Sequence, residues 1–187
     1  MEVIRKVIDL MLEYQKEKGI VEQCITNTQY LYDCIKQNLP DEAHKFRAEP
    51  CIVVAVTNDE QTSVHTYNHF VIKCEGRVID ASYEVYSQKV KTYCYTIAEF
   101  KKTIEGLEMS QEYMKWVISH HITFLRLAKR MNDGELLVCD KEFYDAQADY
   151  IEETLSRAGV LKEGDSDRSS NPNDSRHLGE ALGLSAL

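Results

Sequence analysis

One stretch of the chain, residues 66–83, decides the fold: Thr-Tyr-Asn-His-Phe-Val-Ile-Lys-Cys-Glu-Gly-Arg-Val-Ile-Asp-Ala-Ser-Tyr. It holds two short apolar runs, residues 70–72 and 78–79, on either side of Glu75-Gly76. Two residues of the Xaa-Gly type between two such runs favour a tight β-hairpin turn. We therefore predict two antiparallel strands joined at Glu75-Gly76.

The predicted hairpin also fixes which side chains lie together. The turn places Cys74 opposite Arg77 and Val71 opposite Asp80. Because strand side chains alternate between two faces, His69 shares a face with Val71 and is a diagonal neighbour of Asp80. A histidine oriented by an aspartate on the adjacent strand is half of a nucleophilic triad. The remaining question is whether the chain supplies the nucleophile.

The length and net charge of the chain limit the classes of protein to which it can belong. The chain has 187 residues, which favours one domain with a real core. Its net charge of −9 argues against a general binder of nucleic acid or of anionic membranes. Its apolar runs all fall short of the roughly 20 residues that a membrane-spanning helix needs. We therefore expect neither nucleic acid nor membrane as a partner; the oligomeric state stays open.

The cysteines and histidines favour thiol chemistry over metal binding. Six cysteines are spread along the chain without a close Cys-x-x-Cys pair, which makes a zinc ribbon or a thioredoxin motif an unfavoured interpretation. The N-terminal residues are amphipathic and do not resemble a secretory signal, so we expect an intracellular, cytoplasmic protein with reduced thiols. His120 and His121 are adjacent on a predicted helix and do not share a face. We expect no metal site.

Helical and strand periodicities give the order of the elements. Two helices come first, strands gather in the middle, and helices follow, which indicates an α+β fold with an antiparallel β-sheet and N-terminal and C-terminal helices around it. Residues 1–161 are predicted to form one domain, and residues 162–187 a disordered tail. The expected helices are 2–18, 24–38, 96–105, 110–131 and 140–157, and the expected strands are 51–57, the hairpin and 91–95, with residues 40–50 irregular.

We interpret the aromatic residues mainly as packing residues of the fold. The predicted stripe of helix 110–131 places His120 inward, and Trp116 is interpreted as a core or helix-packing residue. Tyrosines near the last strand could line a substrate cleft, but strand tyrosines usually pack, and packing is the favoured interpretation. These tyrosines are Tyr83, Tyr86, Tyr93 and Tyr95.

Cys24 is the candidate nucleophile because it stands at a predicted helix start. The unpaired backbone amides and the helix dipole there favour a thiolate over a thiol. Cys51 and Cys74 lie in predicted strands, where a thiol usually behaves as a small buried hydrophobe. Cys34 lies on the apolar side of the second helix.

The order of these residues resembles that of the transglutaminase-like branch of the papain-like thiol enzymes. In that branch a cysteine begins a helix, a core strand follows, and histidine and aspartate lie on the next two strands. Three short motifs carry the resemblance, which covers about residues 19–95: Cys24-Ile-Thr-Asn27, Asn68-His69-Phe70-Val71 and Gly76-Arg-Val-Ile-Asp80-Ala-Ser.

The resemblance implies a papain/transglutaminase-like fold and a role for each residue. Cys24 would be the nucleophile, His69 the base and later the acid, and Asp80 the residue that holds the imidazole tautomer. The Cys24 amide and Gln23 would form the oxyanion hole, and Asn27 would support the helix start. The implied reaction is acyl transfer from an amide bond of a peptide or protein substrate by a hydrolase, deamidase or transglutaminase-type enzyme. No cofactor is implied.

A second interpretation is a catalytically inactive binding module of the same fold. It is favoured by departures from the family pattern: Cys24 has no flanking glycine or tryptophan, and Ala81 replaces a proline. A third interpretation is an α+β interaction protein in which the match of the three residues is a coincidence.

Overall fold

The computed structural model describes residues 2–20, 23–57, 63–82, 90–138 and 140–159. The expected tail, residues 162–187, lies outside the described residues, as do Tyr83 and Tyr86. The elements, in chain order, are α1 (Glu2–Glu17), α2 (Cys24–Asn38), a short 3₁₀ turn η1 (Ala43–Lys45), β1 (Phe46–Thr57), β2 (Ser63–Cys74), β3 (Arg77–Ile79), β4 (Val90–Cys94), α3 (Ile97–Thr103), α4 (Gln111–Asn132) and α5 (Lys141–Arg157).

The four strands form one antiparallel sheet in the order β3-β2-β1-β4. The predicted hairpin register is confirmed, because Cys74 pairs with Arg77 and Ile72 with Ile79. Glu75 and Gly76 connect the two strands with φ angles of 48° and 80°. Positive φ at both central residues is what a type I′ turn requires.

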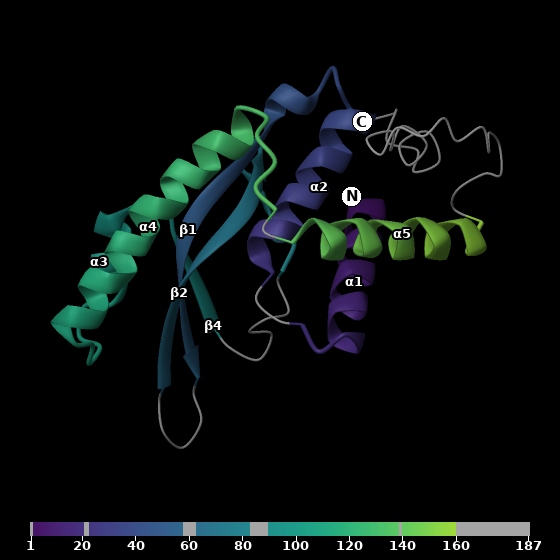
Figure 1. Ribbon diagram of the computed structural model, residues 1–187. Helices are drawn as coiled ribbons and strands as arrows, with labels where there is room; N and C mark the ends of the chain where they lie inside the picture. Colours follow the sequence, from purple (N-terminus) through teal and green to yellow (C-terminus); the bar gives the residue numbers. More distant parts are fainter. Residues whose placement is uncertain (1, 21–22, 58–62, 83–89, 139, 160–187) are drawn as a thin grey trace.

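Helices cover the curled sheet on both sides (Figure 1). The helices α3 and α4 lie on one side, and α2 lies on the other, with α1 and α5 beyond it. Thr96 caps α3 through a complete capping box with Glu99, at the start of the helix that the sequence predicts over residues 96–105. The structure is therefore α+β, with an antiparallel sheet covered by helices on both sides.

Strand β1 begins earlier than predicted, at Phe46 rather than at Cys51, and Pro50 lies inside it. On its outer side β1 pairs with β4 only from Ile52 onward. The backbone N–H and C=O of Ala48 point to that outer side, where they bind the Asn132 side chain at 2.9 and 2.8 Å. Pro50 has the same strand parity as Ala48, so its missing N–H faces a position without a strand partner and breaks no ladder bond.

Residues of the strands contribute to three buried clusters. The largest joins Ala48, Ile72 and Ile79 to buried residues of α1, α2 and α5. Ile52 and Val54 of β1 pack with Phe100 and Val117 on the side of α3 and α4. The opposite face carries buried Cys51, Val53 and Val71, against which Tyr67, Tyr93 and Tyr95 pack. The second face also carries His69, which pairs with Cys51 in the ladder.

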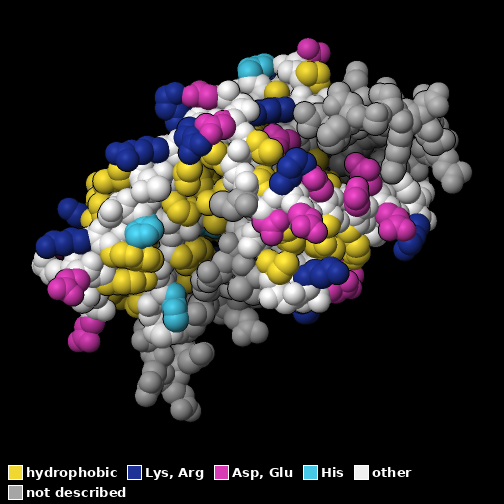
Figure 2. Space-filling view, viewed as in Figure 1, with side chains coloured by type: hydrophobic (Ala, Val, Ile, Leu, Met, Phe, Trp, Pro, Cys, Tyr) yellow, Lys and Arg dark blue, Asp and Glu magenta, His cyan; other side chains and the backbone are white. Residues whose placement is uncertain are grey.

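The apolar stripe of α4 differs from the predicted one by a residue. His121 is buried and His120 is exposed, because the face that meets the sheet follows Val117, His121 and Ala128. Trp116 is not a core residue: it is 51% exposed and lies 4.1 Å from the His120 ring, centroid to centroid. In the view of Figure 2, hydrophobic side chains gather at the surface over α4.

Candidate active site

A buried histidine–aspartate pair lies where the sequence predicts it. His69 Nε2 is 2.8 Å from Asp80 Oδ1. The His69 side chain is 4% exposed and the Asp80 side chain 11%. The hairpin creates this contact, because Asp80 follows β3 directly and lies one step beyond the Ile72–Ile79 pair. Because this ion pair is shielded from water, each partner shifts the pKa of the other.

Asp80 accepts two further hydrogen bonds. The backbone N–H of Ser82 donates to Oδ1 at 2.8 Å, and the Tyr93 hydroxyl donates to Oδ2 at 2.7 Å. Both carboxylate oxygens are therefore engaged, which fixes the rotation of the Asp80 side chain. The Tyr93 ring also packs near His69, with centroids 6.5 Å apart.

These contacts set the protonation states of the pair. Burial raises the pKa of Asp80, but the hydrogen bonds and charge of His69, together with Tyr93 and the Ser82 amide, outweigh burial and lower it. Burial lowers the pKa of His69, but hydrogen bonds to Asp80 and Cys24 outweigh burial and raise it to about 9. At neutral pH the pair is therefore an imidazolium and a carboxylate.

Cys24 is the first residue of α2 and lies against His69. Its side chain is half-buried. Its hydrogen bond to His69 and its electrostatic interaction with His69 both raise the pKa of the imidazole. Since Nε2 of His69 is bonded to Asp80, Nδ1 is the ring nitrogen that remains for the thiol. The residue before the helix, Gln23, makes no side-chain capping bond, and the first backbone bond of the turn runs from Asn27 N–H to the Gln23 carbonyl.

The two predicted supporting residues take different positions. The Gln23 side-chain carbonyl accepts a hydrogen bond from the Thr26 hydroxyl at 3.2 Å, which folds it over the first turn of α2. Asn27 is fully buried and donates to Ser82 Oγ at 2.9 Å and to the Ala81 carbonyl at 3.4 Å. Asn27 thus ties the helix that carries Cys24 to the segment that follows Asp80.

A buried amide network extends this connection to the outer helices. Gln15 of α1 donates to Asn27 Oδ1 and, at 2.6 Å, to Gln147 Oε1 of α5. Asn27 donates back to Gln15 Oε1 at 3.3 Å. Because buried polar groups are costly unless paired, this network restricts how α1, α2 and α5 pack around the site.

The other described cysteines have surroundings that suppress thiolate formation. Burial raises the pKa of Cys34 to about 12 and also raises that of Cys51. Cys51 lies across the ladder from His69, but its side chain has no exposed surface. Cys74 is half-buried like Cys24, and burial and the Glu75 charge raise its pKa.

Tyr93 is the site residue that the sequence interpretation missed. The sequence favours a packing role for Tyr93, and its ring does pack on the cluster of Cys51, Val53 and Val71. However, its hydroxyl reaches Asp80 from the far edge of the sheet, with β2 and β1 between their strands. A local sequence signal for this contact does not exist, because the curl of the sheet brings the two residues together.

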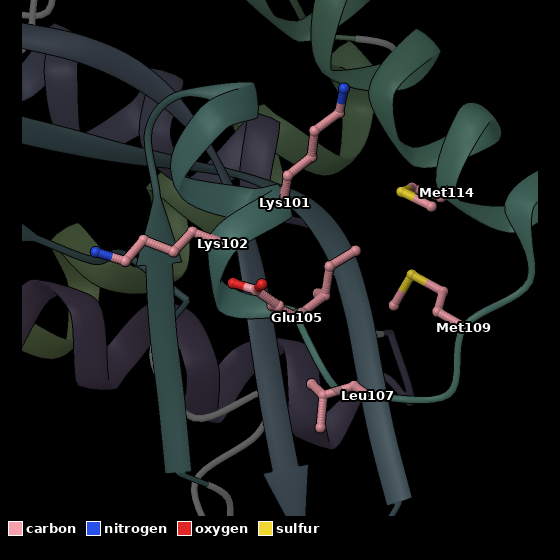
Figure 3. A pocket seen from close by; sticks show the side chains of 7 residues that line it. Lys101, Lys102, Glu105, Leu107, Met109 and Met114 are labelled. Carbon is pink, nitrogen blue, oxygen red and sulfur yellow. The ribbon is translucent and has the colours of Figure 1, made fainter.

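Two open pockets lie away from these residues. Figure 3 shows one of about 450 Å³, with Lys101, Lys102 and Glu105 on one side and Met109 and Met114 on the other. The second, of about 510 Å³, lies between η1, the start of β1 and the end of α4. Neither is lined by a member of the Cys24–His69–Asp80 set.

Comparison with protein-family models, curated proteins and solved structures finds no match for this chain. The family resemblance of the three short motifs therefore stays a prediction. The structure itself defines an α+β protein whose central sheet presents a buried imidazole–carboxylate pair to a cysteine at a helix start. In the described parts of the chain, no helix is long and apolar enough to span a bilayer, and no three metal-ligating side chains cluster.

Proposed function

We propose that this protein is a cysteine enzyme that transfers an acyl group from an amide bond of a peptide or protein to Cys24 and then to water or an amine. One observation carries the proposal: His69 lies between Asp80 at 2.8 Å and the Cys24 side chain. A charged imidazole beside a cysteine favours the thiolate, which is the nucleophilic form of the side chain. The order of the three residues in the chain, cysteine then histidine then aspartate, supports the same chemistry.

In the first step the Cys24 thiolate attacks the carbonyl carbon of the amide. A sulfur–carbon bond forms, and the electron pair of the carbonyl moves to its oxygen. When the tetrahedral intermediate collapses, the carbon–nitrogen bond breaks, and the leaving nitrogen takes a proton from His69. A thioester on Cys24 remains, and His69 is neutral.

In the second step neutral His69 acts as a base. It takes a proton from an incoming water or amine, whose oxygen or nitrogen attacks the thioester carbon. The sulfur–carbon bond then breaks, and Cys24 leaves as a thiolate beside an imidazolium again. Water gives a carboxylic acid, which is hydrolysis or deamidation, whereas an amine gives a new amide.

The start of α2 would stabilise the oxyanion. The Cys24 backbone amide lies in the first turn of the helix, where intrahelical acceptors for N–H groups are lacking. The Gln23 amide group is the nearest side-chain donor in sequence, and its carbonyl is already engaged by Thr26. The bond to Thr26 orients the Gln23 side chain over the same turn.

Selective alkylation of the full chain tests the proposal. At about pH 6, iodoacetamide should label Cys24 at least about tenfold faster than the other five cysteines, followed by peptide mass spectrometry. Cys74 is the informative comparison, because it is also half-buried but lacks a histidine partner of this kind among the described residues. His69→Ala should remove the preference, and Asp80→Asn should weaken it.

Uniform slow labelling of Cys24 and Cys74 would contradict the proposal and favour the catalytically inactive binding module. Circular dichroism of His69→Ala provides the folding control, since a loss of preference is meaningful only in a folded variant. An acyl-probe screen of the unalkylated protein, with and without an added amine, then separates hydrolysis from amine transfer.

A further inference from the structure

The least expected contact of the site is the one between Tyr93 and Asp80. Tyr93 lies on β4 and Asp80 directly after β3, at opposite edges of the four-stranded sheet. The hydroxyl nevertheless lies 2.7 Å from Asp80 Oδ2. A tyrosine that only filled space on this face would not need to bring its hydroxyl to the carboxylate that contacts His69.

Among the described residues, three donors divide the two oxygens of Asp80 between them. His69 and the Ser82 N–H share Oδ1, and Tyr93 donates to Oδ2. Loss of the bond to Tyr93 would remove the described donor from Oδ2 and make it easier for this oxygen to take a proton or to turn toward the imidazole. The Tyr93 hydroxyl thus keeps the carboxylate in one orientation and in its charged form.

We propose that Tyr93 is a positioning residue of the site, whose hydroxyl holds Asp80 ionised and oriented so that Asp80 in turn orients His69 toward Cys24. The inference about Asp80 rests on geometry alone, and its consequence for reactivity rests on the function proposed above. Tyr93 does not contact the reacting atoms itself and acts through Asp80.

The surroundings explain why the hydroxyl stays a donor. Burial and the Asp80 charge both raise the pKa of Tyr93, so the phenol keeps its proton throughout the physiological range. Among the described residues, the titratable side chains that interact electrostatically with Asp80 come from β1, β2, β4 and the residue after β4: Cys51, His69, Lys91, Tyr93 and Tyr95.

Tyr93→Phe is the decisive variant, because it keeps the ring that packs on Cys51 and Val53 and removes only the hydroxyl. We expect the pKa of Asp80, measured by carboxyl-carbon NMR, to rise by about one pH unit or more. The pH below which iodoacetamide labelling of Cys24 declines should then move upward with the Asp80 pKa, and labelling should change little near pH 8, since the lost bond matters most where Asp80 begins to take a proton.

Tyr95→Phe is the matched control. Tyr95 packs on the same cluster, but in the structure its ring lies under Lys73 Nζ, 3.2 Å from the ring centroid, rather than against Asp80. Burial and nearby charges raise the pKa of Tyr95 to about 12, so Tyr95 is neutral over the pH range of the experiment and exerts no charge on Asp80. The Asp80 pKa and the pH profile of labelling should therefore remain those of the unmodified chain. Tyr93→Leu, which removes the ring as well, should lower the free energy of unfolding more than Tyr93→Phe does.

An unchanged Asp80 pKa in Tyr93→Phe would overturn the inference and leave Tyr93 as a packing residue. The proposed function fails separately, if Cys24 of the unmodified chain is not labelled preferentially. In that case the NMR titration still decides whether Tyr93 controls Asp80, because it does not depend on thiol reactivity. An equal change in Tyr93→Phe and Tyr95→Phe would also overturn it, since of these two hydroxyls the one that donates to Asp80 is that of Tyr93.

Discussion

At the scale of single residues, the site depends on His69 keeping its proton in a buried position. Burial alone would favour the neutral imidazole, and the ring is almost completely shielded from water. Hydrogen bonds to Asp80 and Cys24 reverse this preference. The same two partners that would tune the chemistry therefore also couple the protonation of His69 to folding.

The first prediction concerns the pH dependence of stability. The pKa of His69 is about 9 in the folded protein, above its value of about 6.5 in an unfolded chain. The folded state therefore binds this proton more tightly, and the contribution is complete below about pH 6.5 and is lost as the pH rises through about 9. We expect urea unfolding of the unmodified chain to show a loss of up to about 3 kcal/mol across this window.

His69→Gln is the control for this prediction. Glutamine keeps a hydrogen-bonding group toward Asp80 but does not titrate, so its free energy of unfolding should lack the His69 contribution to the pH slope between about pH 6.5 and 9. Identical slopes in both proteins would show that His69 has the same pKa folded and unfolded, and would remove the electrostatic basis of the site.

At the scale of elements, the β2–β3 hairpin decides where Asp80 lies. Its turn uses positive φ at Glu75 and Gly76, and this pair sets the register that places Asp80 beside His69. A different turn length would shift the strand by a residue and move Asp80 to the opposite face. The helix start at Cys24 is the second essential element, and Asn27 fastens it to Ser82.

Gly76→Ala tests the hairpin. A Cβ at this position would meet no atom within 4 Å, so the cost comes only from the φ of 80°. We expect the free energy of unfolding to fall by about 1–2 kcal/mol, measured by urea denaturation. Glu75→Asn is the opposing variant, because asparagine accepts positive φ more readily than glutamate, and it should not destabilise the protein. Equal losses in both variants would contradict the assigned turn.

At the scale of the whole molecule, long-range hydrogen bonds fasten helices to the sheet and to one another. The Gln15–Asn27–Gln147 network connects three helices behind the site. On the other side, Asn132 at the end of α4 binds both backbone groups of Ala48, where β1 extends past β4. The Asn132 side chain thus makes the two hydrogen bonds to Ala48 that a neighbouring strand would otherwise make.

Asn132→Ala should therefore lower the free energy of unfolding by about 1–3 kcal/mol, because the Ala48 backbone groups lose their partners in a part-buried position. Thermal or urea unfolding measures the change. The neighbouring Asp133→Ala is the control: Asp133 pairs with Lys129 at the surface, and its loss should cost less than about 0.5 kcal/mol. A cost for Asn132→Ala as small as that of the control would show that water replaces the amide there.

Local sequence patterns determined most of the elements and half of the candidate site. Apolar periodicity, the capping residues Thr96 and Ser110, and the Glu75-Gly76 turn identify the helices and the hairpin. Strand alternation then suffices to place His69 beside Asp80, because both residues belong to one hairpin and their relation is local.

Only the tertiary structure decided the contacts between residues far apart in the chain. The extension of β1 through Pro50 depends on Asn132, and the register of α4 that buries His121 depends on the shape of the sheet beneath it. Tyr93 reaches Asp80 because the sheet curls, and Asn27 reaches Ser82 because α2 packs beside the hairpin. Periodicity describes one element at a time, whereas these contacts arise from how whole elements pack against each other.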